Sequence, residues 1–299
     1  MLKRLMLLML VLAEGGVTNL QADIGPAAPV AALVIRDGVS EGYVAEILQR
    51  AGIAITLTAE REWEFTGAGY DLADYQVVVL LDDYLGESAG QPDETWAWLY
   101  DMPAEGQQAL KDYVAGGGGL VLTEWVVWDR YCQGQSPHYA TLGEVFAARL
   151  TEEYGCAYSR DVGDTYAVVV PHRITQGLPE IFSFAGEPPP KERPWEGHGR
   201  TSRLRAIEET GEAVLIGAQS VDAVVAGRYG LGRVVHWALG PSSEGCRYSG
   251  EGPLDGGPCF DFKFPPGTPV RAYVETLIQN MALWAAGDGK APDSSAPSQ

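Results

Sequence analysis

The segment "GGGGLVLTEW", residues 116–125, indicates the end of a helix, then a buried strand and a sharp exit from that strand. Glycine commonly ends a helix, and a short apolar run such as "LVL" is typical of a strand covered on both faces. A helix followed by a buried strand is half of the repeating unit of a parallel α/β sheet. The segment also leaves Glu124 near the carboxyl end of the strand, where a carboxylate needs an explanation.

The same alternation precedes this segment. Three apolar runs, "AALVIRDG" (31–38), "IAITLTAE" (53–60) and "YQVVVLLDD" (75–83), predict strands. Between the first two, Ser40 can cap a helix that Gly52 ends, and another helix is predicted to start near Pro103. Strands that alternate with helices in this way predict a parallel sheet covered by helices on both faces.

The second half of the chain continues the pattern less regularly. The segment 141–150 is predicted to be a helix, and residues 270–286 a final amphipathic helix. Four strands are predicted at 166–171, 212–219, 221–229 and 232–240, the last two joined by the tight turn "YGLG". We therefore expect a single domain over residues 30–286, with a loop insertion at 241–269 and a disordered tail at 287–299.

The amino terminus predicts export. Lys3 and Arg4 precede an apolar run that is too short to cross a bilayer, so residues 1–22 are predicted to be a secretory signal peptide. Cleavage after Ala22 is preferred to cleavage after Ala13, and residues 23–29 then form a Pro/Ala-rich leader. We expect a secreted or periplasmic protein that does not contact the membrane after cleavage.

Export would place the four cysteines in an oxidising compartment, where two disulfides are expected. Cys246 pairing with Cys259 is favoured because both lie in one Gly/Pro-rich loop, which leaves Cys132 for Cys156; free buried thiols are the alternative. The chain is acidic, with 40 Asp and Glu against 21 Lys and Arg and a net charge of −19. Such a charge repels nucleic acid and anionic lipid, so neither is expected as a partner.

Several stretches, taken together and in order, resemble a known family. They are "YDLADYQVVVLLDD" (70–83), "LKDYVAGGGGLVL" (110–122), "HRITQGLPE" (172–180), "GRYGLGRVVHWALG" (227–240) and "NMALWAAG" (280–287). Their order and spacing are similar to those of the ThuA-like (trehalose utilisation) branch of the class I glutamine amidotransferase-like superfamily, over roughly residues 30–286. The resemblance implies an α/β, flavodoxin-like fold, with a mostly parallel sheet and helices on both faces.

The chain departs from that family at the positions that carry its chemistry. Amidotransferases have a cysteine in the turn after the strand "GLVLTE" and a histidine after a later strand, because a thiolate needs a base to activate it. Here Glu124 and Trp125 stand in that turn, and "GPSSEG" follows the later strand without a histidine. Arg173 also replaces the proline of the "HPIT" that ThuA-like relatives often carry. Release of ammonia from glutamine is therefore not expected.

Four carboxylates follow predicted strands and are the candidate site residues: Asp37, Asp82, Asp83 and Glu124. Ligands of open α/β sheets bind outside the carboxyl ends of the strands, so these side chains could share a cleft. Converging carboxylates can supply a general acid beside a general base, or bind a hard cation. The alternative is that they form turns and cap helices. No cofactor is predicted, and whether a metal binds is left open.

The carboxylates and the aromatic residues are compatible with two functions. Tryptophans in loops near the carboxyl edge could stack on sugar rings, or simply pack those loops: Trp63, Trp96, Trp98, Trp125, Trp128 and Trp195. The first hypothesis is a domain without the Cys–His pair that binds a small-molecule ligand, possibly a carbohydrate, or a protein partner. The second is an enzyme that acts on a sugar-like substrate with Glu124 and Asp82 or Asp83 as acid and base. His236 is interpreted as a core residue, His172 as a loop-ordering residue, and the oligomeric state is left open.

Overall fold

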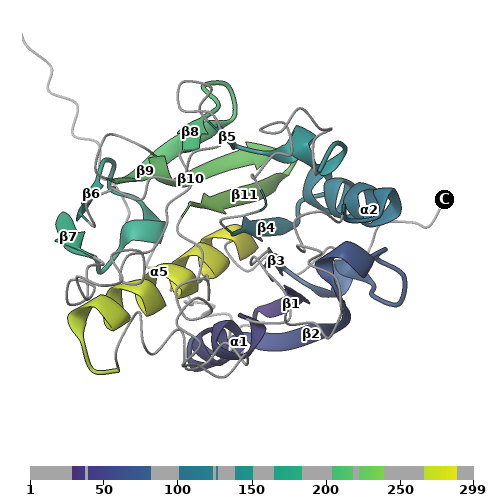
Figure 1. Cartoon of the computed structure of the whole chain (residues 1–299), viewed down its shortest axis with the longest axis horizontal. Coiled ribbons are helices and arrows are strands. Elements are labelled where there is room, and N and C mark those ends of the chain that lie inside the picture. The colour runs from purple at the N-terminus through teal and green to yellow at the C-terminus, as the bar shows by residue number, and fades with distance from the viewer. Residues whose placement is uncertain are drawn as a thin grey trace, which may run out of the picture.

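The computed structural model describes residues 29–37, 40–81, 101–123, 126, 139–150, 165–183, 204–217, 222–238 and 266–287. The predicted signal peptide, all four cysteines and most of the predicted insertion and tail lie outside these residues. Within the described part of the chain, an eleven-stranded sheet forms the centre of the molecule (Figure 1).

Five parallel strands form the core of this sheet. Their order is β2-β1-β3-β4-β11, which is the flavodoxin-like order, because the chain moves to one side of β1 and then returns to the other. The strands are β1 (Ala31–Arg36), β2 (Ala54–Arg61), β3 (Val77–Leu80), β4 (Gly119–Leu122) and β11 (Gly232–Trp237). The predicted α/β, flavodoxin-like fold is confirmed.

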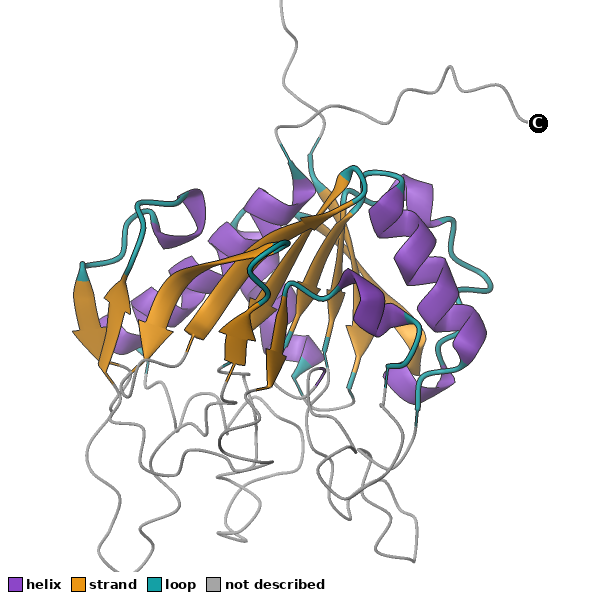
Figure 2. Cartoon of the chain, turned by 90° about the horizontal axis from the view of Figure 1, so that it is seen from above, coloured by secondary structure: helices purple, strands orange, loops and turns teal. Residues whose placement is uncertain are grey.

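Helices cover both faces of this parallel core (Figure 2). Helices α1 (Glu41–Arg50) and α5 (Pro269–Ala286) pack on one face, and α2 (Ala104–Ala115) packs on the other. Alternate residues of β1 explain the near-continuous apolar runs, since Val34 joins the cluster under α1 and α5 while Leu33 joins the cluster under α2. A strand buried on both faces has no polar side, as the sequence indicated.

The remaining strands extend the sheet in antiparallel pairing. Beyond β11 the order continues β10-β9-β6-β7, and the short strands β5 and β8 pair with each other and, through β8, with β10. Their bounds are β5 (Ala148–Leu150), β6 (Thr165–Val168), β7 (Ile181–Ser183), β8 (Leu204–Ala206), β9 (Gly211–Gly217) and β10 (Asp222–Tyr229). The predicted tight turn between β10 and β11 is present, with Gly230 at a φ of 57°.

The prediction of a helix at 141–150 is wrong. A 3-10 helix at Leu142–Val145 is followed by strand β5, which pairs with β8. The backbone of Ala147 explains the difference, because its N–H donates to His236 Nε2 and its carbonyl accepts from Ile207 N–H. These tertiary partners replace the hydrogen bonds that a helix would have made.

Candidate functional site at the carboxyl edge of the sheet

The ends of the central strands lie side by side. Ile35 of β1 is in register with Leu80 of β3, Leu80 with Leu122 of β4, and Leu122 with His236 of β11. The ladder continues one residue further, since Leu81 N–H donates to Ile35 O at 3.2 Å. The strands are all parallel here, but β2 lies on one side of β1 and the later strands β3 and β4 lie on the other. In folds of this order, ligands bind at this switch point between β1 and β3.

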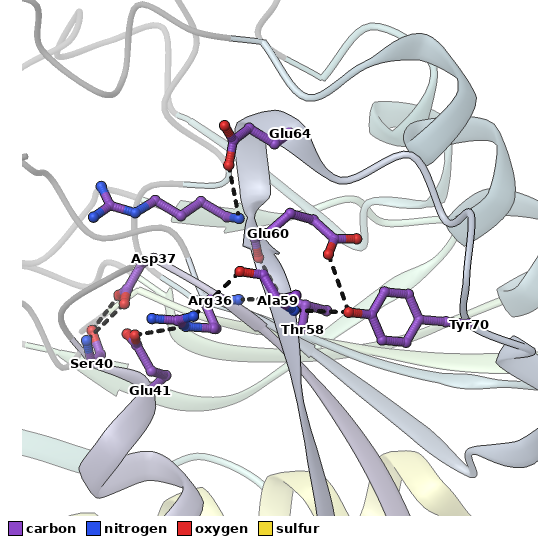
Figure 3. A network of polar contacts seen from close by, with 10 residues as sticks. Arg36, Asp37, Ser40, Glu41, Thr58, Ala59, Glu60, Glu64 and Tyr70 are labelled. Atoms are coloured by element: carbon purple, nitrogen blue, oxygen red, sulfur yellow. Dashed lines mark hydrogen bonds and ion pairs between the residues drawn. The ribbon is translucent and has the colours of Figure 1, made fainter.

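Asp37 is the one predicted site residue in the described part of the chain. It follows β1 directly and is completely buried. Its Oδ1 accepts the backbone N–H of Ser40 at 2.7 Å, and its Oδ2 accepts the Ser40 hydroxyl (Figure 3). The carboxylate therefore ties the residue after β1 to the residue before α1, which is a structural role and the alternative to catalysis.

Ser40 differs from its predicted role. It occupies the N-cap position of α1, but its side chain makes no hydrogen bond to the first turn. The hydroxyl donates instead to Asp37, because that carboxylate is the stronger acceptor and lies three residues earlier. The first turn of α1 is thus held through Asp37.

Two neighbouring residues that sequence reasoning missed, Arg36 and Glu41, belong to the same network. Arg36 Nε donates to Glu41 Oε1 at 3.0 Å, and Arg36 Nη1 donates to Ala59 O at 3.3 Å (Figure 3). Burial raises the pKa of Glu41, but hydrogen bonds with the Asp37 side chain and its own backbone, together with Arg36, outweigh burial and lower this pKa overall. The spacing of Asp37 and Glu41, four residues apart across a helix start, was the available signal.

Tyr70 bonds to residues of β2 at the other end of this network. The Tyr70 hydroxyl accepts Ala59 N–H at 2.8 Å and donates to Glu60 Oε2 at 3.1 Å (Figure 3). Partial burial and the Glu60 carboxylate raise the pKa of Tyr70. Tyr70 thereby gives the Ala59 N–H a side-chain acceptor on β2, which is an edge strand of the sheet.

Asp82, Asp83 and Glu124 lie outside the described residues. The residues just before them are described: Leu81 follows β3 and Thr123 follows β4. Thr123 N–H and its hydroxyl both bond to Leu80 O, each at 3.3 Å, which ties the end of β4 to the end of β3. Among the candidate tryptophans, Trp63 is described; it is half-buried just beyond β2, with the Arg61 guanidinium 5.1 Å from its ring.

The two described histidines have the roles that the sequence predicted. His236 is buried, and its Nε2 accepts Ala147 N–H at 3.2 Å while its ring meets Phe146 edge-on. Burial lowers its pKa to about 3, so the ring is neutral at pH 7. His172 Nδ1 accepts Ile174 N–H at 3.2 Å and so orders the turn at 172–175.

A small apolar pocket lies at this edge on the side of α1 and α5. Its lining residues are buried, and its free space is on the order of that of one water molecule. Leu81, Thr123 and Trp237, at the ends of β3, β4 and β11, form its sheet side. In the described part of the chain, no group of three His, Cys, Asp or Glu side chains could hold a metal ion. No helix among those residues is long and apolar enough to cross a membrane.

Comparisons with known proteins give a likeness of fold. No family model matches the sequence, and no curated protein matches it significantly. The cytoplasmic protein STM3548 from Salmonella typhimurium is 16% identical, with a TM-score of 0.52 over 86% of this chain and 99% of that one. A second Salmonella protein, STM1381, gives a TM-score of 0.50 at 16% identity over 86% and 99% of the two chains.

A protein described as ThuA-like, from Parabacteroides merdae, is also similar. It is 15% identical, with a TM-score of 0.48 over 87% of this chain and 91% of that one. At such identities a shared structure supports a shared architecture, and function depends on the site that each chain builds on it. The chain therefore shares its α/β architecture with the two Salmonella proteins.

Proposed function

We propose that this protein is a ThuA-like domain without the Cys–His pair of the amidotransferases, and that it binds a carbohydrate at the carboxyl edge of its sheet. One observation carries the proposal: β1, β3 and β4 end in register at the reversal of strand order, and each is followed within two residues by an acidic residue. Carboxylates accept hydrogen bonds from sugar hydroxyls, and ligands of such sheets bind at this place.

We assign different roles to the acidic residues at this edge. Asp37 is buried and bonded to Ser40, so it supports the site by fixing the first turn of α1. In the proposal, Asp82, Asp83 and Glu124 supply the acceptors for the ligand. Half-buried Trp63, just beyond β2, supports the carbohydrate, because an aromatic ring can pack against the apolar face of a sugar.

Isothermal titration calorimetry with a panel of monosaccharides and disaccharides, trehalose among them, tests this function. A saturable heat is expected for at least one sugar, and Glu124→Gln should weaken that sugar's affinity by about tenfold or more, because an amide is a poorer acceptor than a carboxylate. Glu208→Gln, which changes an exposed acid beyond the end of β8, is the matched control and should leave the affinity unchanged. Absence of binding to the whole panel, or equal affinity in Glu124→Gln, overturns the proposal; a protein partner would then be the remaining ligand class.

The second candidate function is an enzyme on a sugar-like substrate, with Glu124 and Asp82 or Asp83 as acid and base. The lowered pKa of Glu41 favours keeping it, because this edge already holds a carboxyl group whose pKa is altered by its surroundings. Release of nitrophenol from nitrophenyl glycosides is the measurement. Turnover that Glu124→Gln abolishes while binding persists would establish the enzyme, and no turnover with any glycoside would remove it.

Export is part of the same proposal. We propose that residues 1–22 are removed during secretion and that Cys246 pairs with Cys259. Amino-terminal sequencing and non-reducing peptide mapping of protein expressed with its own leader test both points. Residue 23 at the mature amino terminus and a linked Cys246–Cys259 peptide are expected. An intact Met1, or alkylation of both thiols without reductant, would contradict the corresponding part.

A further inference from the structure

Two arginines lie directly opposite each other beside the turn between β10 and β11: Arg228 is in register with Arg233. The backbone N–H of Arg228 donates to Thr210 O at 3.2 Å on one side of the pair. The N–H of Arg233 donates to Gly118 O at 3.3 Å on the other side. The two residues therefore form a non-hydrogen-bonded pair, the kind in which opposite side chains of an antiparallel ladder lie closest. Like charges in this position destabilise a sheet.

Both arginine side chains lie on the face of the sheet that α5 covers. Ala226 and Val235 are the opposite pair two positions further from the turn, and they belong to the apolar cluster under α1 and α5. Alternate residues of a strand share a face, so the arginines lie on that face too. Arg233 Nη1 donates to Trp284 O at 2.8 Å, and its guanidinium lies 5.4 Å from the centre of the Trp284 ring. The last turn of α5 therefore holds this guanidinium in place.

Arg228 differs from Arg233 in its contacts. It is exposed, and its side chain makes no hydrogen bond or ion pair with the residues that the structure describes. The chain has a second pair of opposed arginines, Arg149 of β5 and Arg205 of β8. There a carboxylate is close, because Asp222 Oδ1 lies 3.9 Å from Arg205 Nη1. The pair at the β10–β11 turn thus keeps a positive charge that the described residues do not neutralise.

The surroundings of His172 confirm that positive charge gathers here. Its ring lies 5.1 Å from the Trp284 ring, to which Arg233 also bonds. Burial lowers the pKa of His172, the Glu212 charge raises it, and the charges of Arg173 and Arg233 lower it again. Glu212 forms no ion pair with Arg228 among the described contacts. An acidic protein with a net charge of −19 therefore has a local basic surface at this place.

We propose that Arg228 and Arg233 form a binding site for a phosphate group, either the free ion or the phosphate of a monoester. Planar guanidinium groups donate in pairs to the oxygens of such an anion, and an anion between the two arginines removes their repulsion. Trp284 positions Arg233, whereas exposed Arg228 can turn toward the ion. The inference goes beyond the proposed function, because this site lies at the start of β11 and the carbohydrate site lies at the opposite end of the parallel strands.

The test is a titration of the full chain with sodium phosphate, followed by the side-chain ¹H–¹⁵Nε NMR signals of Arg228 and Arg233. The loss of one signal in Arg228→Gln assigns Arg228. At an ionic strength of about 0.15 M the Debye length is about 8 Å, so the charge on the rest of the surface is largely screened. Phosphate should shift both signals in a saturable way, and sodium chloride at equal ionic strength should not. Methyl phosphate is the second probe: a saturable shift with it identifies the ligand as a monoester, and a shift with inorganic phosphate alone identifies the free ion.

Two substitutions with the same change of charge locate the effect. Arg228→Gln should weaken the phosphate affinity, measured on the Arg233 signal, by about tenfold or more. Arg149→Gln, in the other opposed pair, is the matched control and should leave this affinity unchanged. Arg228→Lys keeps the charge without the planar group and should give an intermediate affinity. Arg149 and Arg228 are exposed, so these variants should fold.

Three results would overturn the inference. They are the absence of a saturable phosphate shift in the wild-type protein, full affinity in Arg228→Gln, and an equal loss of affinity in Arg228→Gln and Arg149→Gln, which would mean that net charge alone decides binding. The sugar titration is a separate measurement at the other end of the sheet. Sugar binding that persists in Arg228→Gln would leave the proposed function standing whatever the outcome with phosphate.

Discussion

Asp37 shows how a carboxylate at the carboxyl edge of the sheet can have a structural role. Its two oxygens hold the N–H and the hydroxyl of buried Ser40. In Asp37→Ala the buried Ser40 N–H loses its acceptor, so we expect the free energy of unfolding to fall by about 1–3 kcal/mol in urea denaturation. Ser40→Ala removes one donor and leaves the backbone bond, so it should cost less. Equal stability of Asp37→Ala and wild type would show that the turn does not depend on this carboxylate.

His236 predicts how stability depends on pH. Burial lowers its pKa from 6.5 to about 3, so the unfolded chain takes up a proton at a pH where the folded chain does not. This contribution to stability is complete above pH 6.5 and is lost as the pH falls from 6.5 toward 3, by about 1.4 kcal/mol per pH unit. Urea denaturation between about pH 5 and pH 7.5 measures the slope above most of the carboxylate titration.

His236→Gln is the test of that slope, because a Gln side-chain oxygen can still accept Ala147 N–H but cannot titrate. Its unfolding free energy should change less steeply with pH than that of wild type. His172→Gln is the comparison at a half-buried histidine, and because burial lowers that pKa as well, it should also make the slope less steep. A slope that is identical in wild type and His236→Gln would mean that His236 titrates normally in the folded chain.

Two glycines of the run 116–119, Gly116 after α2 and Gly119 at the start of β4, predict a contrast. A Cβ on Gly119 would lie 2.3 Å from Ala285 O, so Gly119→Ala must push β4 and α5 apart. Gly116 has a φ of −76°, and the nearest atom to its Cβ would be 3.3 Å away. We expect Gly119→Ala to lower the free energy of unfolding by about 1–3 kcal/mol or more, and Gly116→Ala to change it by less than about 1 kcal/mol. Similar midpoints of thermal unfolding for the two variants would contradict the close packing of β4 against α5.

The sequence predicted well the elements whose structure follows from their own apolar pattern. Leu33 and Val34 are apolar on successive positions because both faces of β1 are covered, so the pattern alone identifies a central parallel strand. The segment 141–150 was predicted wrongly because its structure depends on contacts with distant parts of the chain. Its apolar residues suit a helix, but Ala147 bonds to His236 and to Ile207, which lie 89 and 60 residues away in the sequence. No local pattern contains that information.

The same limit applies to the candidate site. The fold brings the ends of β1, β3 and β4 to one edge, and the sequence predicted this because alternating strands and helices indicate a parallel sheet. An acid follows each of these strands in the sequence. It did not predict that Asp37 turns inward to Ser40 or that Arg36 bonds to Glu41, because both depend on the angle at which α1 leaves β1. The pocket at Trp237 was also missed. Its lining comes from α1, α5 and three strands, and only the packed fold brings them together.

The net charge of −19 gives the protein a predictable response to salt. Like charges repel across a folded surface and are further apart in the unfolded chain, so self-repulsion destabilises the fold at low ionic strength. Salt also screens attractive pairs such as Arg50–Glu275 at 2.9 Å, but exposed pairs contribute about 0–1 kcal/mol each. With 40 acidic residues against 21 basic ones, the relief of repulsion should outweigh the screening of ion pairs.

We expect the midpoint of thermal unfolding to rise between about 10 mM and about 300 mM NaCl, a range over which the Debye length falls from about 30 Å to below 8 Å. Potassium chloride should act equally, since the effect depends on ionic strength. A midpoint that falls with added salt would mean that ion pairs, such as the Arg50–Glu275 contact between α1 and α5, outweigh the net charge.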